Sequence, residues 1–439
     1  MAEIDSAAPE PTEVLIERAG AAVARAAVEV MVGRYGRRVV VLAGPGNNGA
    51  DGRAAARRLR RRGVRVRVFP ATDAVETLPP ADLYIDAAFG TGLSRPYTPP
   101  RRGCCDAPVL AVDIPSGLDG LTGGVLGGPV WTAQRTVTFA ALKPGLLFGQ
   151  GPAACGTTTV ADIGLAVGDD DGEACALFTD GDVEALPAGT GATHKWHAAA
   201  LVVAGSPGMG GAASLACSAA LRSGARMVHL NSPAAAGTAW PVEVVRFEPP
   251  LTVDADRFMV CAAGPGLGTG QEAAARLAEA LALGLPTVVD ADGLRLLCHP
   301  AVAAVMDQRG GSSPAVLTPH DGEFEALMSA RPGPDRIAGA RAAAAQLDAV
   351  VLLKGGPTVV ADAAGRVRIV SSGDARLATA GTGDVLTGVI TGRMAAFGPE
   401  RLIDRVAEAA HLHGRAAAAV GGSRLVASDL LGALRAVTP

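Results

Sequence analysis

The sequence has few aromatic residues, no long apolar run and no paired cysteine motif. Aromatic side chains make up 3% of its 439 residues while hydrophobic residues make up 49%, so Ala, Val and Leu must form most of the core. No apolar run reaches the roughly 18 residues that a membrane-spanning helix needs. The N-terminal segment also lacks the basic and apolar regions of a signal peptide. We therefore expect a cytoplasmic protein with no membrane association.

Cysteine content and charge exclude further classes. Seven cysteines are an odd number without CxxC spacing, which argues against a disulfide framework and against a structural zinc site. A formal net charge of −4 gives no overall attraction to nucleic acid. The sequence thus predicts reduced thiols and no nucleic-acid partner.

The order of apolar runs predicts an α/β fold. A chain of 439 residues is too long for one ordinary core, which indicates two domains. Short β runs lead into Gly- or Asp-bearing turns and then helices, the first such helix starting near Arg53. These runs are 38–43, 64–69, 81–86 and 109–113 in the first half, and 199–205, 257–263, 286–290, 315–317 and 349–354 in the second. This alternation predicts parallel, doubly wound sheets with ligands at the carboxyl ends of the strands.

A polar, acidic stretch separates the two halves. The strand-like run 157–163 is followed by Gly168–Glu173, which has no apolar periodicity. We place a linker at 166–177, and so predict a first domain at 1–170 and a second at 178–439.

The run Ala378–Gly388 is the most informative stretch of the chain. Its glycines let backbone N–H groups face a phosphate, and a helix expected from Val385 onward adds a favourable dipole. Asp384 can take a proton from an attacking hydroxyl. The run predicts a phosphoryl-transfer site with Asp384 as catalytic base, against the alternative of a glycine turn that only closes a loop.

In the first half, oxygen-bearing side chains stand beside glycines at three consecutive strand ends. The three runs are 44–52, 86–96 and 113–120. Because these ends converge in a parallel sheet, Asn48, Asp86 and Ser116 could jointly bind a hard cation, while Asp51 and Asp113 face an organic substrate. The alternative is that each aspartate only caps the turn that follows it.

Four motifs of the first half together resemble the N-terminal epimerase domain of bifunctional NAD(P)H-hydrate repair enzymes, a Rossmann-like three-layer α/β/α domain. They are NNGADG at 47–52, DAAFGTGLSRP at 86–96, VDIPSGLDG at 112–120 and FAALKPG at 139–145. The resemblance covers most of residues 10–165. In the last motif, Lys143 could contact a phosphate or be solvated.

The resemblance implies a site for hydrated NADH or NADPH. Its substrate-binding residues would be Asn47, Asn48, Gly49, Ala50, Asp51, Gly90, Thr91, Gly92, Leu93, Ser94, Arg95, Pro96 and Asp113. A potassium ion would be held by Asn48, Asp86 and Ser116. Inversion of the carbinolamine needs only acid and base help, for which Asp113 is the candidate.

The second half resembles the ADP-dependent dehydratase domain of the same family, which has the ribokinase-like α/β fold, over about 178–437. The motifs are the glycine turn at 205–212, GPGLG at 264–268, VDADGL at 289–294, LTPHDGE at 317–323, LKGGPT at 353–358 and the run 378–388. By this resemblance the hydrate would contact Ala212, Gly266, His320 and Asp384. ADP or ATP would contact Lys354, Gly355, Gly356, Pro357, Thr358 and Gly383, with Mg²⁺ as a further cofactor.

The chemistry of the leaving group explains why a kinase-like site could dehydrate. Hydroxide leaves the hydrated ring poorly, whereas phosphate leaves well with help from the lone pair of the ring nitrogen. Asp384 would deprotonate the hydroxyl, and elimination would follow in-line phosphoryl transfer. Lys354 would find its ionic partner in the nucleotide phosphate, while Asp290 and Asp292 would help hold Mg²⁺ or only cap turns.

The sequence departs from the family pattern in both halves. Residues 97–106 form a proline-bearing loop where a helix is expected, so this flank of the sheet could be covered by a partner subunit in a homo-oligomer. Trp196 and Ala199 stand where the family usually has glycine, so the loop entering the first strand of the second half must differ.

Two rival hypotheses stay open at this point. One is a kinase of the same superfamily that phosphorylates a vitamin precursor. The other is an active dehydratase beside a non-catalytic nucleotide-binding first half.

Overall fold

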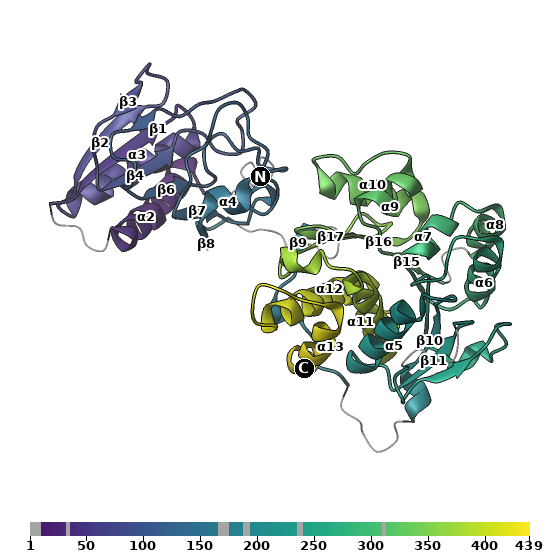
Figure 1. The fold of residues 1–439 in the computed structure, drawn as a ribbon. Coiled ribbons are helices and arrows are strands. Elements are labelled where there is room, and N and C mark those ends of the chain that lie inside the picture. Colours follow the sequence, from purple (N-terminus) through teal and green to yellow (C-terminus); the bar gives the residue numbers. More distant parts are fainter. Residues whose placement is uncertain (1–9, 32–35, 166–174, 188–193, 235–239, 310–312) are drawn as a thin grey trace. The chain divides into compact units, whose positions relative to one another are not determined.

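A computed structural model describes residues 10–31, 36–165, 175–187, 194–234, 240–309 and 313–439. The chain forms two compact units, Met1–Asp169 and Asp170–Pro439. Both units are α/β, as the sequence predicts (Figure 1). Every strand-like run expected from the sequence contains a strand.

The first unit is built on a parallel sheet of six strands, ordered β2-β1-β4-β6-β7-β8. These strands are β1 (Arg38–Ala43), β2 (Arg65–Pro70), β4 (Leu83–Ala87), β6 (Val109–Val112), β7 (Arg135–Phe139) and β8 (Thr157–Ala161). The chain runs from β1 to β2 on one side and then returns to β4 on the other. The sheet therefore has its topological switch point between β1 and β4, where doubly wound folds bind ligands.

Helices α2 (Thr12–Val30) and α3 (Asn47–Arg61) pack together on one face of this sheet. Their approach is close, because a Cβ atom at Gly20 of α2 would lie 2.4 Å from the Ala54 Cβ atom of α3. Two short elements follow β7, namely η1 (Pro144–Leu146) and α4 (Gly151–Cys155). The close packing of α2 on α3 therefore depends on small residues, glycine and alanine, where the two helices meet.

The opposite face of the first sheet is covered by loops and by a two-stranded ribbon. The ribbon consists of β3 (Thr77–Leu78) and β5 (Arg101–Arg102), and no helix forms within 97–106, as expected. Tyr84 and Trp131 pack edge to face at this surface, with ring centroids 5.9 Å apart. Tyr84 is fully buried by the chain itself, and the cover of this flank by a partner subunit stays a prediction.

The second unit contains a sheet of ten strands, ordered β12-β11-β10-β13-β14-β15-β16-β17-β18-β9. The strands are β9 (Cys175–Leu177), β10 (Ala199–Val203), β11 (Met227–Asn231), β12 (Val245–Phe247), β13 (Val260–Ala263), β14 (Thr287–Val289), β15 (Ala315–Leu317), β16 (Val350–Leu353), β17 (Thr358–Ala361) and β18 (Val367–Val370). All pairs are parallel except those that β17 makes with β16 and β18. Because β9 pairs with β18, residues 175–177 belong to this sheet and not to the linker expected at 166–177. Residues 166–174 lie outside the described residues.

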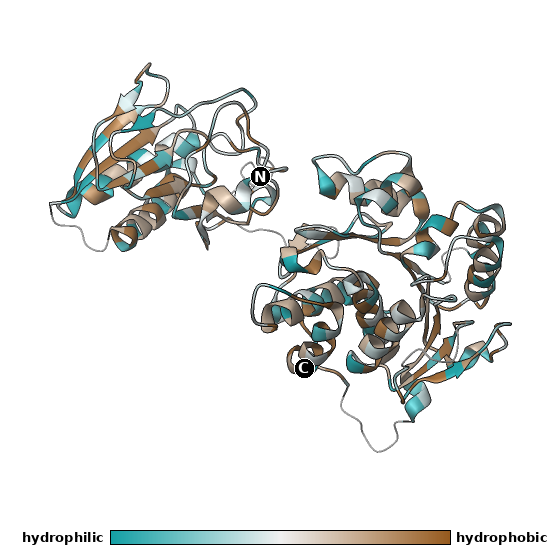
Figure 2. Cartoon of the chain, in the orientation of Figure 1, coloured by the Kyte–Doolittle hydropathy of each residue, from teal (hydrophilic) through white to brown (hydrophobic). Residues whose placement is uncertain are grey.

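Helices cover both faces of the second sheet. One face carries α5 (Gly210–Arg222), α11 (Thr382–Phe397), α12 (Leu402–Ala419) and α13 (Ala427–Val437), and the other carries α6 (Gln271–Ala282), α7 (Asp292–Leu296), α8 (Pro300–Arg309), α9 (Asp321–Met328) and α10 (Arg336–Leu347). The remaining short turns are η2 (Asp180–Asp182), η3 (Lys195–Ala198), η4 (Ala255–Arg257) and η6 (Ala375–Leu377). Hydrophobic residues concentrate on the strands (Figure 2). None of the helices in the described part of the chain has the length and apolar character needed to cross a bilayer.

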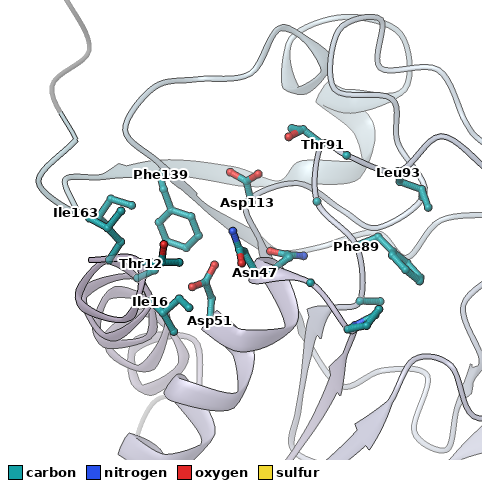
Figure 3. A pocket seen from close by; sticks show the side chains of 18 of the residues that line it. Thr12, Ile16, Asn47, Asp51, Phe89, Thr91, Leu93, Asp113, Phe139 and Ile163 are labelled. Carbon is teal, nitrogen blue, oxygen red and sulfur yellow. The ribbon is translucent and has the colours of Figure 1, made fainter. Parts of the chain in front are cut away.

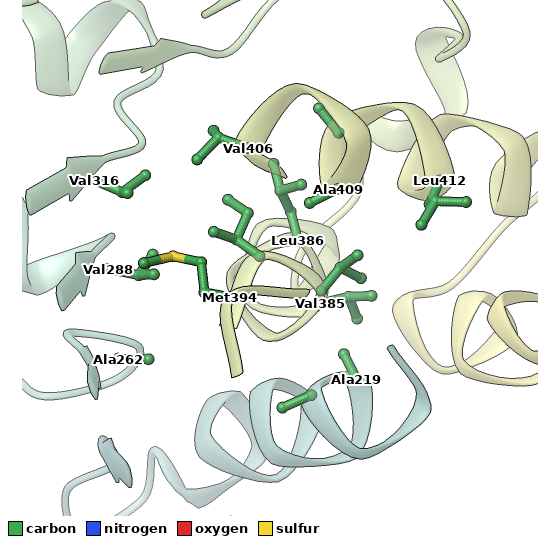
Figure 4. Close-up of a cluster of buried hydrophobic side chains, with 14 of the residues drawn as sticks. Ala219, Ala262, Val288, Val316, Val385, Leu386, Met394, Val406, Ala409 and Leu412 are labelled. Carbon is green, nitrogen blue, oxygen red and sulfur yellow. The ribbon is translucent and has the colours of Figure 1, made fainter. Parts of the chain in front are cut away.

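Helix α11 is the centre of the second core. Met394 of this helix points toward Val288 of the sheet, and Val385 lies in the same buried cluster on the side of the helix away from the strands (Figure 4). A Cβ atom at Gly388 would lie 2.2 Å from the carbonyl oxygen of Ala216 in α5, so only glycine allows the two helices to approach this closely. The start of α11 is therefore held firmly at the edge of the sheet.

A buried ionic network joins α11 to α12. The Arg393 guanidinium lies 2.6 Å from a Glu408 carboxylate oxygen, and these side chains are 0% and 1% exposed. Arg405 contacts both Glu408 and Glu184, at 3.3 and 2.7 Å. Glu408 thus compensates two guanidinium groups that have little access to water.

Replacing Glu408 with Gln is expected to lower the free energy of unfolding of the second unit by about 3 kcal/mol, because a buried ion pair that loses one partner leaves a charge uncompensated. Urea denaturation followed by fluorescence would measure the loss. Glu325→Gln on α9 is the matched control, because its pair with Arg331 is exposed and its loss should cost less than about 0.5 kcal/mol. Equal losses in the two variants would contradict a stabilising role for the network.

Candidate functional site

A cavity of about 590 Å³ opens at the switch point of the first sheet (Figure 3). Asn47, Asn48 and Asp51 line it from the first turns of α3, and Asp113 lines it from the end of β6. Helix α3 begins at Asn47 and not near Arg53, so the two amides and the carboxylate belong to a helix start instead of a free glycine loop. The helix N-terminus thereby faces the cavity with its unpaired N–H groups.

Most of the predicted substrate residues of the first half meet in this cavity. Those that line it are Asn47, Asn48, Asp51, Gly90, Thr91, Gly92, Leu93, Ser94, Arg95 and Asp113. Gly49, Ala50 and Pro96 are not among the lining residues. At Gly49 a Cβ atom would lie 1.9 Å from the carbonyl oxygen of Gly44, so this glycine permits packing of α3 against the end of β1.

Sequence reasoning missed the apolar wall of the cavity. That wall is formed by Leu15, Ile16, Ala19, Phe139, Ile163 and Leu165. The apolar stripe of α2 was the available signal, but such a stripe also fits an ordinary core face. The cavity thus offers polar groups on one side and apolar groups on the other, which suits a ring held beside a polar reacting centre.

Asp113 is held in an unusual position. Its backbone φ is +66°, a left-handed value that L residues rarely adopt. Its Oδ1 atom lies 2.6 Å from Nζ of Lys143 and accepts a hydrogen bond of 3.0 Å from the Thr138 hydroxyl. Lys143 is therefore a buried ionic partner of Asp113, and not the solvated side chain or phosphate contact that the sequence suggests.

The three predicted cation ligands gather around Phe89 and Gly90. Asp86 is 1% exposed, and it accepts hydrogen bonds from the hydroxyl and the backbone N–H of Ser116, at 2.6 and 2.9 Å. Burial raises the pKa of Asp86, and the hydrogen bonds from Ser116 oppose that rise. The amide atoms of Asn48 are buried and have no hydrogen-bond partner among the described residues. A Cβ atom at Gly90 would lie 3.6 Å from the Asn48 side chain, and the Phe89 N–H donates to the Ser116 hydroxyl.

In the second unit, Asp384 lies in the first turn of α11. The helix begins at Thr382, after Gly381 with φ of +85°, and not at Val385 as expected. Burial raises the pKa of Asp384 to about 7, and the negative charge of Asp290 adds to that rise. A carboxyl group that titrates near neutral pH is suited to act as a general base.

Lys354 and Asp290 form the ion pair next to this carboxyl group. The Lys354 ammonium donates to Oδ1 of Asp290 at 2.6 Å, and the Thr387 hydroxyl donates to Oδ2 at 2.6 Å. Burial opposes ionisation of Asp290, but the charge of Lys354 and these hydrogen bonds outweigh it and lower its pKa. Asp290 is thus an ionic partner of Lys354 that the sequence did not predict, and contact of Lys354 with a nucleotide phosphate stays a prediction.

The same contacts change the expected role of the acidic residues. Both carboxylate oxygens of Asp290 are engaged, and Asp292 accepts a hydrogen bond of 2.9 Å from the Gly268 N–H. No cluster of three or more His, Cys, Asp or Glu side chains in the described ranges is arranged to hold a metal ion. Asp292 therefore holds the GPGLG turn and Asp290 holds Lys354 and α11, while a role of either residue in holding Mg²⁺ stays a prediction.

The predicted substrate contacts of the second unit are brought together only in part. A Cβ atom at Gly266 would lie 3.2 Å from the Ala212 Cβ atom, so the GPGLG turn touches the start of α5. His320 caps α9, where its Nδ1 atom accepts hydrogen bonds from the N–H groups of Gly322 and Glu323. Its ring is half exposed, and its role toward a substrate stays a prediction.

Arg336 is a further residue of the site that sequence reasoning missed. It donates a hydrogen bond of 2.7 Å to the carbonyl oxygen of Lys354 and pairs with Asp321 at 2.9 Å. A Cβ atom at Gly355 would lie 2.7 Å from its guanidinium. Arg336 thus ties the start of α9 to the predicted nucleotide turn, and no local motif distinguishes it from other arginines.

The altered loop before β10 is explained by aromatic packing. Trp196 in η3 lies against His229 and Phe258, with ring centroids 5.3 and 6.0 Å apart. Ala199 is the first residue of β10 and is fully buried. Trp196 and Ala199, which replace glycine here, are therefore accommodated by side-chain packing at the start of β10.

Comparison with known proteins finds a matching family for each half of the chain. The family described as NAD(P)H-hydrate dehydratase matches residues 200–437, and the family described as YjeF-related protein N-terminus matches 12–74 and 69–145. A bifunctional NAD(P)H-hydrate repair enzyme from Mycobacterium tuberculosis is 39% identical over 393 residues, covering 82% of this chain and 78% of that protein. One from Salinibacter ruber is 36% identical over 499 residues, covering 96% and 91%.

A solved structure resembles the second unit. It is an ADP/ATP-dependent NAD(P)H-hydrate dehydratase from Bacillus subtilis, co-crystallised with ATP and Mg²⁺. It is 29% identical with a TM-score of 0.51, and the match covers 60% of this chain and 97% of that one.

Gly383→Ala is expected to weaken nucleotide binding without disturbing the fold. The new methyl group would lie 3.6 Å from Nζ of Lys354, an ordinary contact, but it would occupy the space beside the ammonium where a phosphate would sit. The expected loss of ADP affinity is about tenfold, or ~1.4 kcal/mol, measured by isothermal titration calorimetry. Gly432→Ala on α13 meets open space and is the matched control. Unchanged affinity in Gly383→Ala would place the phosphate elsewhere.

Proposed function

Because the chain belongs to the family of bifunctional NAD(P)H-hydrate repair enzymes, we propose that it restores hydrated NADH and NADPH in two steps. The first unit interconverts the R and S epimers of the hydrate. The second unit dehydrates the S epimer and converts ADP to AMP and phosphate. The observation that carries this proposal is the placement of Asp384 in the first turn of α11, with a pKa of about 7 and the Asp290–Lys354 ion pair beside it.

In the dehydration step, Asp384 takes the proton of the substrate hydroxyl. The hydroxyl oxygen then bonds to the terminal phosphorus of ADP while AMP leaves. Backbone N–H groups of Gly381–Gly383 stabilise the charge on the phosphoryl group in transfer. The lone pair of the ring nitrogen next expels phosphate, and loss of a proton from the neighbouring ring carbon restores the double bond.

The nucleotide would lie along Lys354–Thr358 and against Gly383. Asp290 holds the Lys354 ammonium in place, which lowers the entropy lost when a phosphate binds there. Mg²⁺ would arrive with the nucleotide phosphates, because both oxygens of Asp290 already have partners. The use of ADP in preference to ATP is part of the proposal.

In the epimerisation step, Asp113 serves as acid and base at the ring carbon. The hydroxyl leaves one face with help from the ring nitrogen, and water adds to the other face. The residues at 47–51 and 90–96 would orient the nucleotide within the cavity.

A potassium ion fits the polar group formed by Asn48, Asp86 and Ser116. The unpaired amide of Asn48 and the buried carboxylate of Asp86 are oxygen donors of the kind that hard cations prefer. Among the described residues, burial and hydrogen bonds from Ser116 and Ala88, and no cationic side chain, act on the pKa of Asp86. When bound, the ion would supply a fixed positive charge next to the substrate site.

A vitamin-precursor kinase is not favoured, because the relatives align along both halves of the chain. All seven cysteines are free, which suits the reducing cytoplasm that we propose as the location.

A homo-oligomer stays a prediction, to be tested by analytical ultracentrifugation.

The central test supplies both hydrate epimers with ADP and Mg²⁺ and follows the return of reduced nicotinamide by its absorbance. The intact chain is expected to recover all of the cofactor. Asp384→Ala should recover none, because the hydroxyl then lacks its base. Asp113→Ala should stop at the fraction present as the S epimer.

Incomplete recovery by the intact chain would contradict the epimerase assignment and leave the dehydratase. A stable phosphorylated product would contradict the elimination step. No reaction with either ADP or ATP would overturn the whole proposal.

The dehydration rate is expected to rise as pH increases through about 7, where Asp384 loses its proton. The negative charge of Asp292 contributes to this raised pKa, so Asp292→Asn should move the acid limb of kcat/KM to lower pH, by less than about one unit. Asn can still accept the hydrogen bond from Gly268. Asp335→Asn, at the exposed cap of α10, is the control and should leave the profile in place. An acid limb that stays fixed in Asp292→Asn would argue against Asp384 as the titrating base.

A further inference from the structure

We propose that Lys143 is the positioning residue of the first site, that it orients the carboxylate of Asp113, and that Oδ2 of Asp113 is the atom that exchanges the proton. This inference rests on the proposed epimerase function. It assigns a role to a side chain that does not itself touch the cavity.

Lys143 is committed entirely to groups of the protein. Its side chain is 3% exposed. Its ammonium lies 2.6 Å from Oδ1 of Asp113, and it donates to the Thr138 hydroxyl at 2.9 Å and to the Phe139 carbonyl at 2.8 Å. An ammonium has three N–H donors, and these three acceptors account for all of them. Lys143 therefore has no donor left for a substrate phosphate or hydroxyl.

The two oxygens of Asp113 have different surroundings. Oδ1 receives the Lys143 ammonium and also the Thr138 hydroxyl, at 3.0 Å. Oδ2 is the oxygen next to Gly90, where a Cβ atom would lie 3.4 Å from it. Gly90 and Asp113 both line the cavity, and the Asp113 carboxylate points into it beside Asn47 (Figure 3). The geometry thus leaves Oδ2 as the oxygen available to a bound ring.

The strained backbone of Asp113 indicates that this orientation is maintained by its neighbours. Its N–H donates to the Val137 carbonyl of β7 at 2.7 Å, so the residue is tied to β7 by its backbone and by its side chain. Thr138 and Phe139 of β7 are the same residues that accept hydrogen bonds from Lys143. The Lys143 ammonium therefore cross-links the carboxyl ends of β6 and β7 at the place where Asp113 needs its left-handed φ.

In the reaction, Oδ2 takes a proton from the water that adds to the ring carbon. The hydroxide lost from the other face recombines with that proton. One water leaves and one enters, so no further reagent is consumed.

The test measures interconversion of purified hydrate epimers without any nucleotide, so that the dehydratase stays idle. Lys143→Met is expected to lower kcat for epimerisation by about 100-fold with little change in KM, because general acid–base help is lost while the cavity walls remain. Thr138→Val removes a neutral donor to Oδ1 and one acceptor of the Lys143 ammonium but leaves the ion pair, so it should have a much smaller effect. Dehydration of the S epimer by the same variants is the internal control and should stay at the wild-type rate.

A double variant separates a positioning role from an independent one. If Lys143 acts through Asp113, then Asp113→Asn combined with Lys143→Met should be no slower than Asp113→Asn alone. The double variant removes both charges, so neither is left buried without its partner. It should therefore fold and remain comparable with Asp113→Asn even if Lys143→Met alone does not fold.

Three results would overturn the inference. They are wild-type epimerisation in Lys143→Met, a raised KM with unchanged kcat, and a further large loss in the double variant. If the intact chain itself does not interconvert the epimers, the proposed function fails first, and that outcome is distinct from the three.

Discussion

The ion pair between Asp290 and Lys354 is the interaction on which the second site depends. It joins the ends of β14 and β16, and the Thr387 hydroxyl connects it to α11. Burial raises the pKa of Asp384 to about 7, the charge of Asp290 adds to that rise, and the charge of Lys354 opposes it. The same pair fixes the ammonium next to Gly383. One buried pair thus holds both a carboxylate near Asp384 and an ammonium beside Gly383.

The first unit uses a similar pair for a different purpose. Asp113 and Lys143 join the ends of β6 and β7, but here the carboxylate faces the cavity and the ammonium faces the protein. In the second unit the carboxylate of Asp290 is the buried partner, and Lys354 is the more exposed one. A lysine–aspartate pair at the end of parallel strands can therefore present either a base or a cation to a ligand, depending on which partner is buried.

The sequence was sufficient to predict the fold class, a strand within each expected run and the polar side of the cavity in the first unit, but not its apolar wall or strands such as β7, β11 and β17. It was not sufficient to predict where helices begin, because Asn47 and Thr382 stand in glycine-rich runs that fit a loop equally well. It also could not pair charges distant in the chain, such as Lys354 with Asp290 or Lys143 with Asp113. Those pairs form only when the sheet brings the ends of its strands together, so no single motif in the sequence indicates them.

The sequence also does not show which role each glycine has. In the sequence, Gly49, Gly383 and Gly388 all belong to motifs rich in glycine. The structure separates them, because a Cβ atom at Gly49 or Gly388 would collide with backbone, whereas at Gly383 it would meet only ordinary contacts beside Lys354. The first two are required for the packing of helices, while nothing in the protein requires Gly383 to lack a side chain. A ligand that needs the space would explain the missing side chain at Gly383, and this is the physical argument for the phosphate that we propose at the start of α11.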